Sequence, residues 1–199
     1  NSERHLLKII NEINKCEIDF LLIGGDLIDS SSASIASLKH FKNLKCPIYF
    51  VTGNHEYYIK NSTSIISNLN KYNIQHISNQ SIIFKDLNLI GIDDNLSKVQ
   101  QMKLLNNKLK ETYYNLLLVH KPSIWDKIND NVDLMLSGHT HNGQIFPFNL
   151  FVRIQFKFKY GLYNNNNSFL YVSSGSGPWG PKMRLGTFNE VILFNLSPK

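Results

Sequence analysis

Short apolar runs bounded by glycine constrain the fold of this chain more than any other feature. Phe20 to Ile23 is followed directly by two glycines, and Ile48 to Val51 ends two residues before another. Such runs are typical of buried strands. Each follows a segment whose apolar residues have helical spacing, Glu3 to Lys15 before the first run and Ser34 to Lys45 before the second. This alternation with short links predicts parallel strands covered by helices.

The rest of the chain continues the alternation and then changes to hairpins. Further helices are expected at Thr63 to Tyr72 and Lys98 to Lys110. Further strands are expected at Gln75 to Ile77, Ser81 to Phe84, Leu87 to Ile92, Leu116 to Val119, Asp133 to Leu136, Phe169 to Val172 and Val191 to Leu196. The stretch from Phe146 to Asn167 is expected to be irregular. The fold class is therefore α/β, with two stacked sheets in a single domain over residues 1–199.

Composition excludes several classes of protein. The 199 residues are 42% hydrophobic and 18% charged, which is too apolar for a disordered chain. No uninterrupted apolar run approaches the roughly 18 residues that a membrane-spanning helix needs. The formal net charge of +6 suggests anionic partners, but charge alone does not separate nucleic acid, a phosphorylated metabolite and an anionic membrane.

Residue types that bind metals follow four of the expected buried strands. They are Asp26 and Asp29, then Asn54 and His55, then His120, and finally His139 and His141. In open α/β sheets, ligands bind in the crevice beyond the carboxyl ends of the strands. These side chains are therefore expected to converge at one edge of the sheets.

Taken singly, these motifs differ in what they indicate. Asp26 after two glycines is more typical of a helix or turn cap than of a ligand. Asn54 with His55 fits a turn as well as a metal site, and His120 fits a satisfied histidine at a strand end. His139 and His141 favour a ligand role, because an extended backbone would aim both imidazoles to the same side.

Taken together, the ordered set Gly25-Asp26, Gly53-Asn54-His55-Glu56, His120 and Gly138-His139-Thr140-His141 resembles the calcineurin-like metallophosphoesterase superfamily. The likeness runs from about Asp19 to Leu196. The continuation as far as Ile145 and Pro147 is similar to the YkuE-type bacterial phosphohydrolases, which usually carry glycine in place of Asn142. The resemblance implies a four-layer sandwich, in which two stacked mixed sheets are flanked by helices.

The resemblance also implies a role for each matching residue. Asp26 would bridge two metal ions, which Asn54, His120 and His139 on one side and His141 on the other would help to hold. His55 would face the scissile phosphate and act as the catalytic proton donor. Asp29 would orient one of the metal-binding imidazoles.

One motif of the superfamily has no match in the sequence. The opening Asp-x-His motif, which follows the first strand and supplies two ligands to the His141 site, is expected upstream of Asn1. The printed residues are thus expected to lack that strand and to form one nearly complete metal site and one incomplete site. Such dinuclear sites hydrolyse phosphoesters, with Mn as the usual ion and Fe, Zn or Mg as alternatives. The competing hypothesis is a non-catalytic scaffold or an inactive fragment.

The substrate is indicated only by the segment from Phe146 to Tyr163, which interleaves aromatic and basic residues. This composition suits a lipid-linked phosphate or peripheral contact with a membrane, although a solvated hairpin with an aromatic inner face fits it too. Lys182 and Arg184 are candidates for holding a distal phosphate. A phosphorylated small molecule is the other substrate class, and no nucleic-acid partner is expected. The domain itself is expected to be soluble, either cytoplasmic or peripheral to a membrane, with an N-terminal anchor outside the sequence left open.

Overall fold

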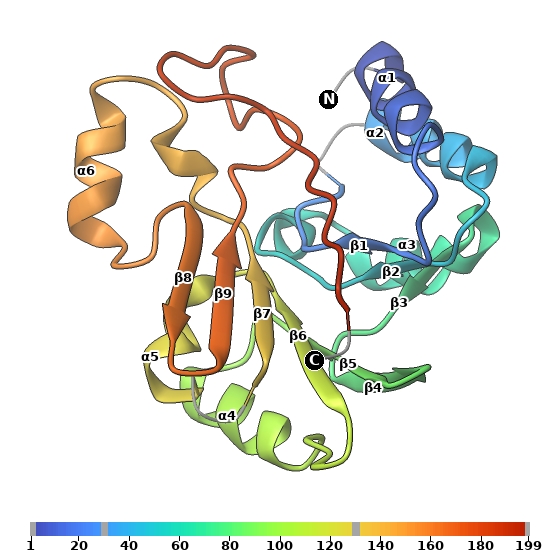
Figure 1. Ribbon diagram of the computed structural model, residues 1–199. Coiled ribbons are helices and arrows are strands. Elements are labelled where there is room, and N and C mark those ends of the chain that lie inside the picture. Colours follow the sequence, from blue (N-terminus) through green and yellow to red (C-terminus); the bar gives the residue numbers. More distant parts are fainter. Residues whose placement is uncertain (1–2, 29–31, 129–131, 198–199) are drawn as a thin grey trace.

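The computed structural model describes residues 3–28, 32–128 and 132–197 and contains two β-sheets with helices on their outer faces (Figure 1). The strands are β1 (Leu21–Ile23), β2 (Ile48–Phe50), β3 (Ile74–His76), β4 (Gln80–Phe84), β5 (Leu87–Ile92), β6 (Tyr114–Val119), β7 (Leu134–Ser137), β8 (Gly161–Asn165) and β9 (Ser168–Val172).

Helical elements connect these strands. The α-helices are α1 (Glu3–Ile13), α2 (Ser32–Ser37), α3 (Ser62–Ser67), α4 (Lys98–Asn106), α5 (Trp125–Ile128) and α6 (Phe148–Gln155). Short 3₁₀ segments are η1 (Leu38–Asn43), η2 (His55–Tyr58), η3 (Leu69–Tyr72), η4 (Pro122–Ile124) and η5 (His141–Gly143). The two longer helices predicted between β1 and β3 are thus each split into an α-helical and a 3₁₀ part.

The two sheets differ in strand direction. The first has the order β1-β2-β3 and is parallel throughout, with Leu22 opposite Tyr49 and Tyr49 opposite Gln75. The second has the order β4-β5-β6-β7-β9-β8. Its central strands are parallel, whereas β4 and β8 pair in antiparallel fashion with β5 and β9. The second sheet is therefore mixed, as expected, and the first is not.

Three hydrophobic clusters define four layers. One lies between the sheets and includes Val51, Leu89 and Leu118. A second joins the first sheet to α1 and its neighbouring helices, and a third joins the second sheet to α4 and α5. The predicted architecture of two stacked sheets flanked by helices is confirmed.

The prediction of a C-terminal strand at Val191 to Leu196 was wrong. This segment, coloured dark red in Figure 1, has no regular structure, and the ring of Phe194 packs at 5.4 Å from the ring of Tyr171 in β9. Val191 is 50% exposed and Leu193 63% exposed. An apolar sequence becomes a strand only where a neighbouring backbone accepts its hydrogen bonds, and within the described residues no strand pairs with this segment.

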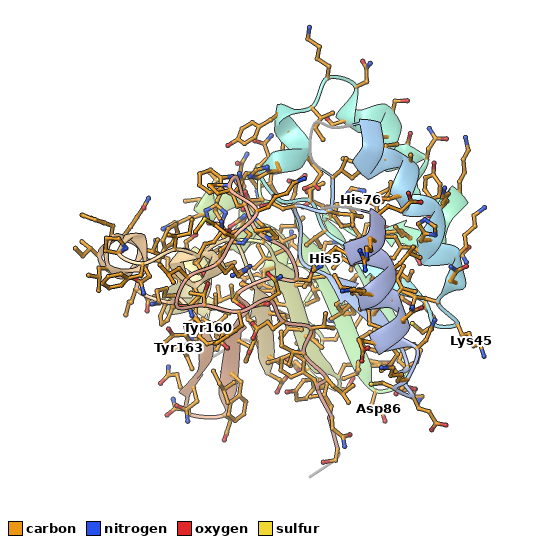
Figure 2. All side chains as sticks on the ribbon, turned by 90° about the horizontal axis from the view of Figure 1, so that it is seen from above. His5, Lys45, His76, Asp86, Tyr160 and Tyr163 are labelled. Carbon is orange, nitrogen blue, oxygen red and sulfur yellow. The ribbon has the colours of Figure 1, made fainter. Side chains whose placement is uncertain are left out.

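The stretch from Phe146 to Asn167 was expected to be irregular and is not. It contains α6 and β8, and the asparagine run from Asn164 to Asn167 forms the tip of the β8-β9 hairpin. The α6 helix was not predicted from the sequence, because four of its eight residues are aromatic or β-branched, a composition typical of strands. It projects at the side of the molecule in both views (Figures 1 and 2).

The layer between the sheets should dominate stability. Leu89 is fully buried there, so Leu89→Ala is expected to lower the free energy of unfolding by about 2 to 5 kcal/mol through lost burial and a residual cavity. Val99→Ala, at a helix position that is 73% exposed, should change it by less than about 0.5 kcal/mol. Urea unfolding of both variants measures the difference. Equal losses would contradict the packing described here.

Candidate metal centre

Asp26, Asn54, His120 and His139 meet where β1, β2, β6 and β7 end. Nε2 of His120 lies 3.1 Å from Oδ2 of Asp26, 3.2 Å from Oδ1 of Asn54 and 3.1 Å from Nδ1 of His139. Ligand atoms of Asp26, His120 and His139 all lie within 4.8 Å of one another. Two of the four residues follow strands of the first sheet and two follow strands of the second, so the site spans both sheets.

The orientation of His120 is fixed by the backbone. Its Nδ1 lies 2.7 Å from the carbonyl oxygen of Gly24, and because a carbonyl only accepts, Nδ1 must carry a proton and donate it. In the neutral ring, Nε2 therefore presents its lone pair to the other donor atoms. Such a bond from the distal nitrogen is the usual way in which a protein orients a metal-binding imidazole.

These donor atoms fit a divalent cation. Electron-rich atoms of a carboxylate, an amide and a second imidazole lie 3.1 to 3.2 Å from Nε2 of His120, a crowding that a proton or a cation between them relieves. Mixed oxygen and nitrogen donors suit Mn, Fe and Zn. The residues present are therefore consistent with a metal site.

Two glycines make this convergence sterically feasible. A Cβ on Gly53 would lie 2.2 Å from Oδ1 of Asp26, and one on Gly25 would lie 2.5 Å from Nδ1 of His120. Gly25 also has a φ of +100°, which side chains rarely adopt. Both positions require glycine because the ligand side chains pass directly over the backbone.

Glu56 ties together the two loops that carry Asp26 and Asn54. Its carboxylate, 1% exposed, accepts hydrogen bonds from the backbone N–H groups of Asp26 at 3.0 Å, Ile28 at 3.0 Å and Gly53 at 2.7 Å. Burial raises the pKa of Glu56 even though these donors favour its ionised form. Sequence reasoning assigned Glu56 no role, although it completes the Gly-Asn-His-Glu motif.

The surroundings shift the pKa values of the residues in this cluster in different directions. Burial alone would raise the pKa of Asp26, but the hydrogen bond and charge of His120 and the N–H of His55 outweigh it and lower the pKa to about 2. Burial likewise disfavours a charged His120, yet Asp26 raises its pKa above the usual value. Without metal, the Asp26 carboxylate and a proton on His120 thus stabilise each other.

His139 and His141 are held neutral instead. Burial, followed by the charge of His120, lowers the pKa of His139 to about 3. Burial, followed by the charge of Arg184, lowers the pKa of His141 to about 4. Both imidazoles therefore have unprotonated nitrogens at neutral pH, as metal ligands must.

The backbone around these histidines differs from the expectation of an extended strand. His139 has a φ of 69° and His141 a φ of 49°, both in the left-handed region, and Asp26 has a φ of 54°. The chain reverses there because the 3₁₀ segment η5 begins immediately after Thr140. Non-glycine residues in this region cost on the order of 1 to 3 kcal/mol each and are retained mainly at functional sites.

His141 lies apart from the four-residue cluster. Nη1 of Arg184 donates to its carbonyl oxygen at 3.1 Å, and Nη2 of Arg184 lies 3.4 Å from its Nδ1. The same Nη2 donates to the carbonyls of Ser174 at 2.7 Å and Gly177 at 2.8 Å. Arg184 thus organises the loop behind His141, and its contact with substrate stays a prediction.

The remaining predicted residues are His55, Lys182 and Asp29. The backbone N–H of His55 donates to Oδ1 of Asp26 at 2.9 Å, and its ring packs edge-on against Tyr58 at 5.6 Å. Nδ2 of Asn54 lies 3.4 Å from the hydroxyl of Tyr58, which leaves Oδ1 facing His120. Lys182 is exposed and lines a cavity of about 320 Å³ together with Arg184. Asp29 lies outside the described residues.

A sequence profile of calcineurin-like phosphoesterases matches residues 2–143, well over half of the chain. The chain belongs to the calcineurin-like phosphoesterase family. Its narrower likeness to the YkuE-type enzymes stays a prediction.

Relatives of this calcineurin-like phosphoesterase occur in bacteria and animals. An uncharacterized metallophosphoesterase of Helicobacter pylori (strain ATCC 700392 / 26695) is 37% identical, over 96% of this chain and 54% of that protein. One from Campylobacter jejuni is 34% identical, over 99% of this chain and 55% of that protein. A Bos taurus "Transmembrane protein with metallophosphoesterase domain" is 30% identical over 92% of this chain and 46% of its own length. The chain spans about half the length of these relatives.

Among solved structures, the crystal structure of TT1561 of Thermus thermophilus is similar. It matches with a TM-score of 0.57 and 11% identity, over 87% of this chain and 84% of that one. At this identity the likeness concerns the fold alone. It shows that a similar arrangement of helices and strands occurs in a solved structure.

Glu56→Gln should weaken metal binding, because the amide keeps one acceptor oxygen and turns an NH₂ group toward backbone donors. We expect the affinity for Mn²⁺, measured by calorimetry on the folded chain, to fall by about 10- to 100-fold. Glu111→Gln removes the same charge at an exposed position and should leave the affinity unchanged. Normal Mn²⁺ binding by the Glu56 variant would refute the positioning role.

The metal-free chain should lose stability as the pH falls from about 6.5 to 4. The unfolded chain takes up protons on His139 and His141 near the ordinary pKa of 6.5, whereas the folded chain resists until about 3 and 4. The stability that these two neutral histidines contribute is thus complete above pH 6.5 and declines below it. His139→Gln/His141→Gln should flatten this part of the curve in urea unfolding at each pH. An unchanged slope would contradict the lowered pKa values.

Proposed function

We propose that this domain hydrolyses phosphoesters with two divalent metal ions. The observation that carries the proposal is the convergence of Asp26, Asn54, His120 and His139 on one point between the sheets. The donor set consists of a carboxylate, an amide oxygen and two imidazoles. It has no evident structural purpose. Family membership supports the reaction class.

Each residue of the centre has a proposed place. His120, His139, Asn54 and Asp26 would hold the first ion, and Asp26 and His141 would contribute to the second. Because the described residues offer few donors beside His141, we propose that an Asp-x-His motif from outside the printed sequence completes the second position. Mn is the favoured ion, with Fe, Zn or Mg as alternatives.

When bound, two such ions supply an activated water and neutralise charge on the phosphoryl oxygens. His55 is the proposed proton donor to the leaving oxygen, since its partly exposed ring follows directly on Asn54 at the mouth of the cluster. Its backbone N–H holds Asp26, so the same residue would position a ligand and serve the reaction. Lys182 is assigned to a distal anionic group of the substrate.

The proposed substrates are phosphomonoesters, phosphodiesters or pyrophosphates, including ones linked to lipids. Support for a membrane-associated substrate comes from the aromatic and basic composition of residues 146–163. The Bos taurus relative is named as a transmembrane protein, which agrees with an association of this kind. Within the part of the present chain that the structure describes, no helix is long and apolar enough to cross a bilayer.

Hydrolysis of bis-p-nitrophenyl phosphate and p-nitrophenyl phosphate with added Mn²⁺ tests the proposal. A version extended upstream to include the Asp-x-His motif should be active and should lose activity in EDTA. Asp26→Ala and His139→Ala should each lower kcat by about 100-fold or more, because each removes a ligand that orients the reaction. Glu111→Gln serves as the control of unchanged activity.

The outcomes separate the enzyme from the alternative. Activity that persists in both ligand variants would show that the reacting groups lie elsewhere. An extended chain that binds Mn²⁺ but hydrolyses neither compound would favour the non-catalytic scaffold. Activity found only in the extended version would support the proposal that the Asp-x-His motif completes the second metal position.

A further inference from the structure

An exposed apolar surface borders the loop that carries His139 and His141. Its large side chains, here called the apolar rim, are between 49% and 84% exposed. The rim consists of Phe146, Leu150, Ile154, Trp179, Met183 and Leu185. Soluble proteins rarely leave so many large apolar side chains together in water unless the surface binds something.

The two segments that form the rim are joined by hydrogen bonds. The backbone N–H of Phe146 donates to the carbonyl of Leu185 at 3.0 Å, and Nε2 of Gln144 donates to the carbonyl of Trp179 at 2.6 Å. Oε1 of Gln144 in turn accepts from the N–H of Trp179 at 2.6 Å. The loop from Trp179 to Leu185 is therefore joined to the segment from Gln144 to Phe146 that leads into α6.

The α6 helix presents its apolar residues outward. Leu150 and Ile154 are four residues apart and so share one face, at 49% and 84% exposure. The helix lies at the periphery of the molecule in Figure 1, and Figure 2 shows it extending away from the body, beyond Tyr160 and Tyr163. A helix in this position can contact a flat surface without obstruction from the sheets.

The rim lies in a stretch of the sequence with an excess of cations, of which Lys157 is paired with Asp126 at 2.7 Å. Between Asp133 and Glu190 the sequence contains no Asp or Glu, whereas it contains five Lys and Arg, a contribution of +5 to the formal net charge of +6. Lys182 is exposed between Trp179 and Met183, within the rim itself. Apolar side chains with an exposed cation among them match a surface that is apolar below a layer of negative charge.

We propose that the apolar rim docks this domain onto an anionic phospholipid bilayer. Phe146, Leu150 and Ile154 enter the boundary between headgroups and acyl chains, Trp179 lies at headgroup level, and Lys182 meets the lipid phosphates. A neutral protein groove would match the apolar side chains but would leave the exposed Lys182 within the rim without a counterpart. The absence of acids from residues 134–189 therefore favours the bilayer.

Docking would also orient the metal centre. The ring of Phe156, which follows α6 directly, packs at 5.5 Å from the ring of His139. At its other end, α6 follows the turn that carries His141, and the N–H of Asn149 donates to the carbonyl of Ile145 at 3.2 Å. The rim is thus rigidly connected to the predicted ligands. Resting on the proposed function, this connection assigns the substrate to phosphoesters carried by membrane lipids.

Sedimentation of the 199-residue chain with vesicles tests the docking separately from catalysis. Vesicles of phosphatidylcholine with phosphatidylglycerol should bind the chain, more weakly at high salt, and vesicles of phosphatidylcholine alone should bind it poorly. Leu150→Glu/Ile154→Glu should weaken binding by about tenfold or more, because charges replace inserted apolar groups. Val99→Glu on α4, at a position 73% exposed, is the matched control and should bind normally.

Three results would overturn the docking. The first is failure of the wild-type chain to bind anionic vesicles, and the second is equal binding by the double variant. The third is a dimer of the wild-type chain that becomes a monomer in the double variant, which would assign the rim to a second copy of the chain. Circular dichroism first verifies that the double variant is folded.

Catalysis is measured in the version extended upstream. Hydrolysis of bis-p-nitrophenyl phosphate should be unaffected by the double variant, since the rim touches no reacting group. Vesicle binding without hydrolysis would refute the proposed function and leave the docking intact. Hydrolysis without vesicle binding would refute the docking and leave the proposed function intact.

Discussion

The carboxylate of Glu56 is the constraint on which the candidate site depends. Three backbone N–H groups from two loops point at one buried side chain, so the loop after β1 and the loop after β2 have a common anchor. A buried carboxylate is costly to desolvate, and only donors of this number and alignment make it tolerable. With the loops fixed, Asp26 can hold its left-handed backbone, and its side chain can pass over Gly53 toward His120.

Much of this arrangement was predictable from sequence because it depends on local order along the chain. Buried parallel strands end at one edge, so residues such as Asn54 and His120 that directly follow them must gather there. The structure places Asp26, Asn54, His120 and His139 together as that reasoning expected. Their roles as metal ligands, and that of His141, stay predictions.

Other features depended on partners that a linear pattern does not contain. Val191 to Leu196 has the composition of a strand, but strand formation needs a neighbouring backbone. The α6 helix carries residues typical of strands, and its position depends on contacts such as the hydrogen bond from Asn149 to Ile145 and the packing of Phe156 on His139. Glu56 and Arg184 bond mainly to backbone groups distant in sequence, and no spacing in the sequence reveals such contacts.

The distribution of the four converging residues over both sheets has a mechanical consequence. An ion held by Asp26 and Asn54 on one side and by His120 and His139 on the other would act as a cross-brace between two sheets that pack on each other through a layer of apolar side chains. Ligand binding to the native state alone stabilises it by mass action, so such an ion would tighten the packing between the sheets. Conversely, the hydrophobic layer sets the separation of the donor atoms. The apolar core would thereby tune metal affinity from a distance, through residues that never touch the ion.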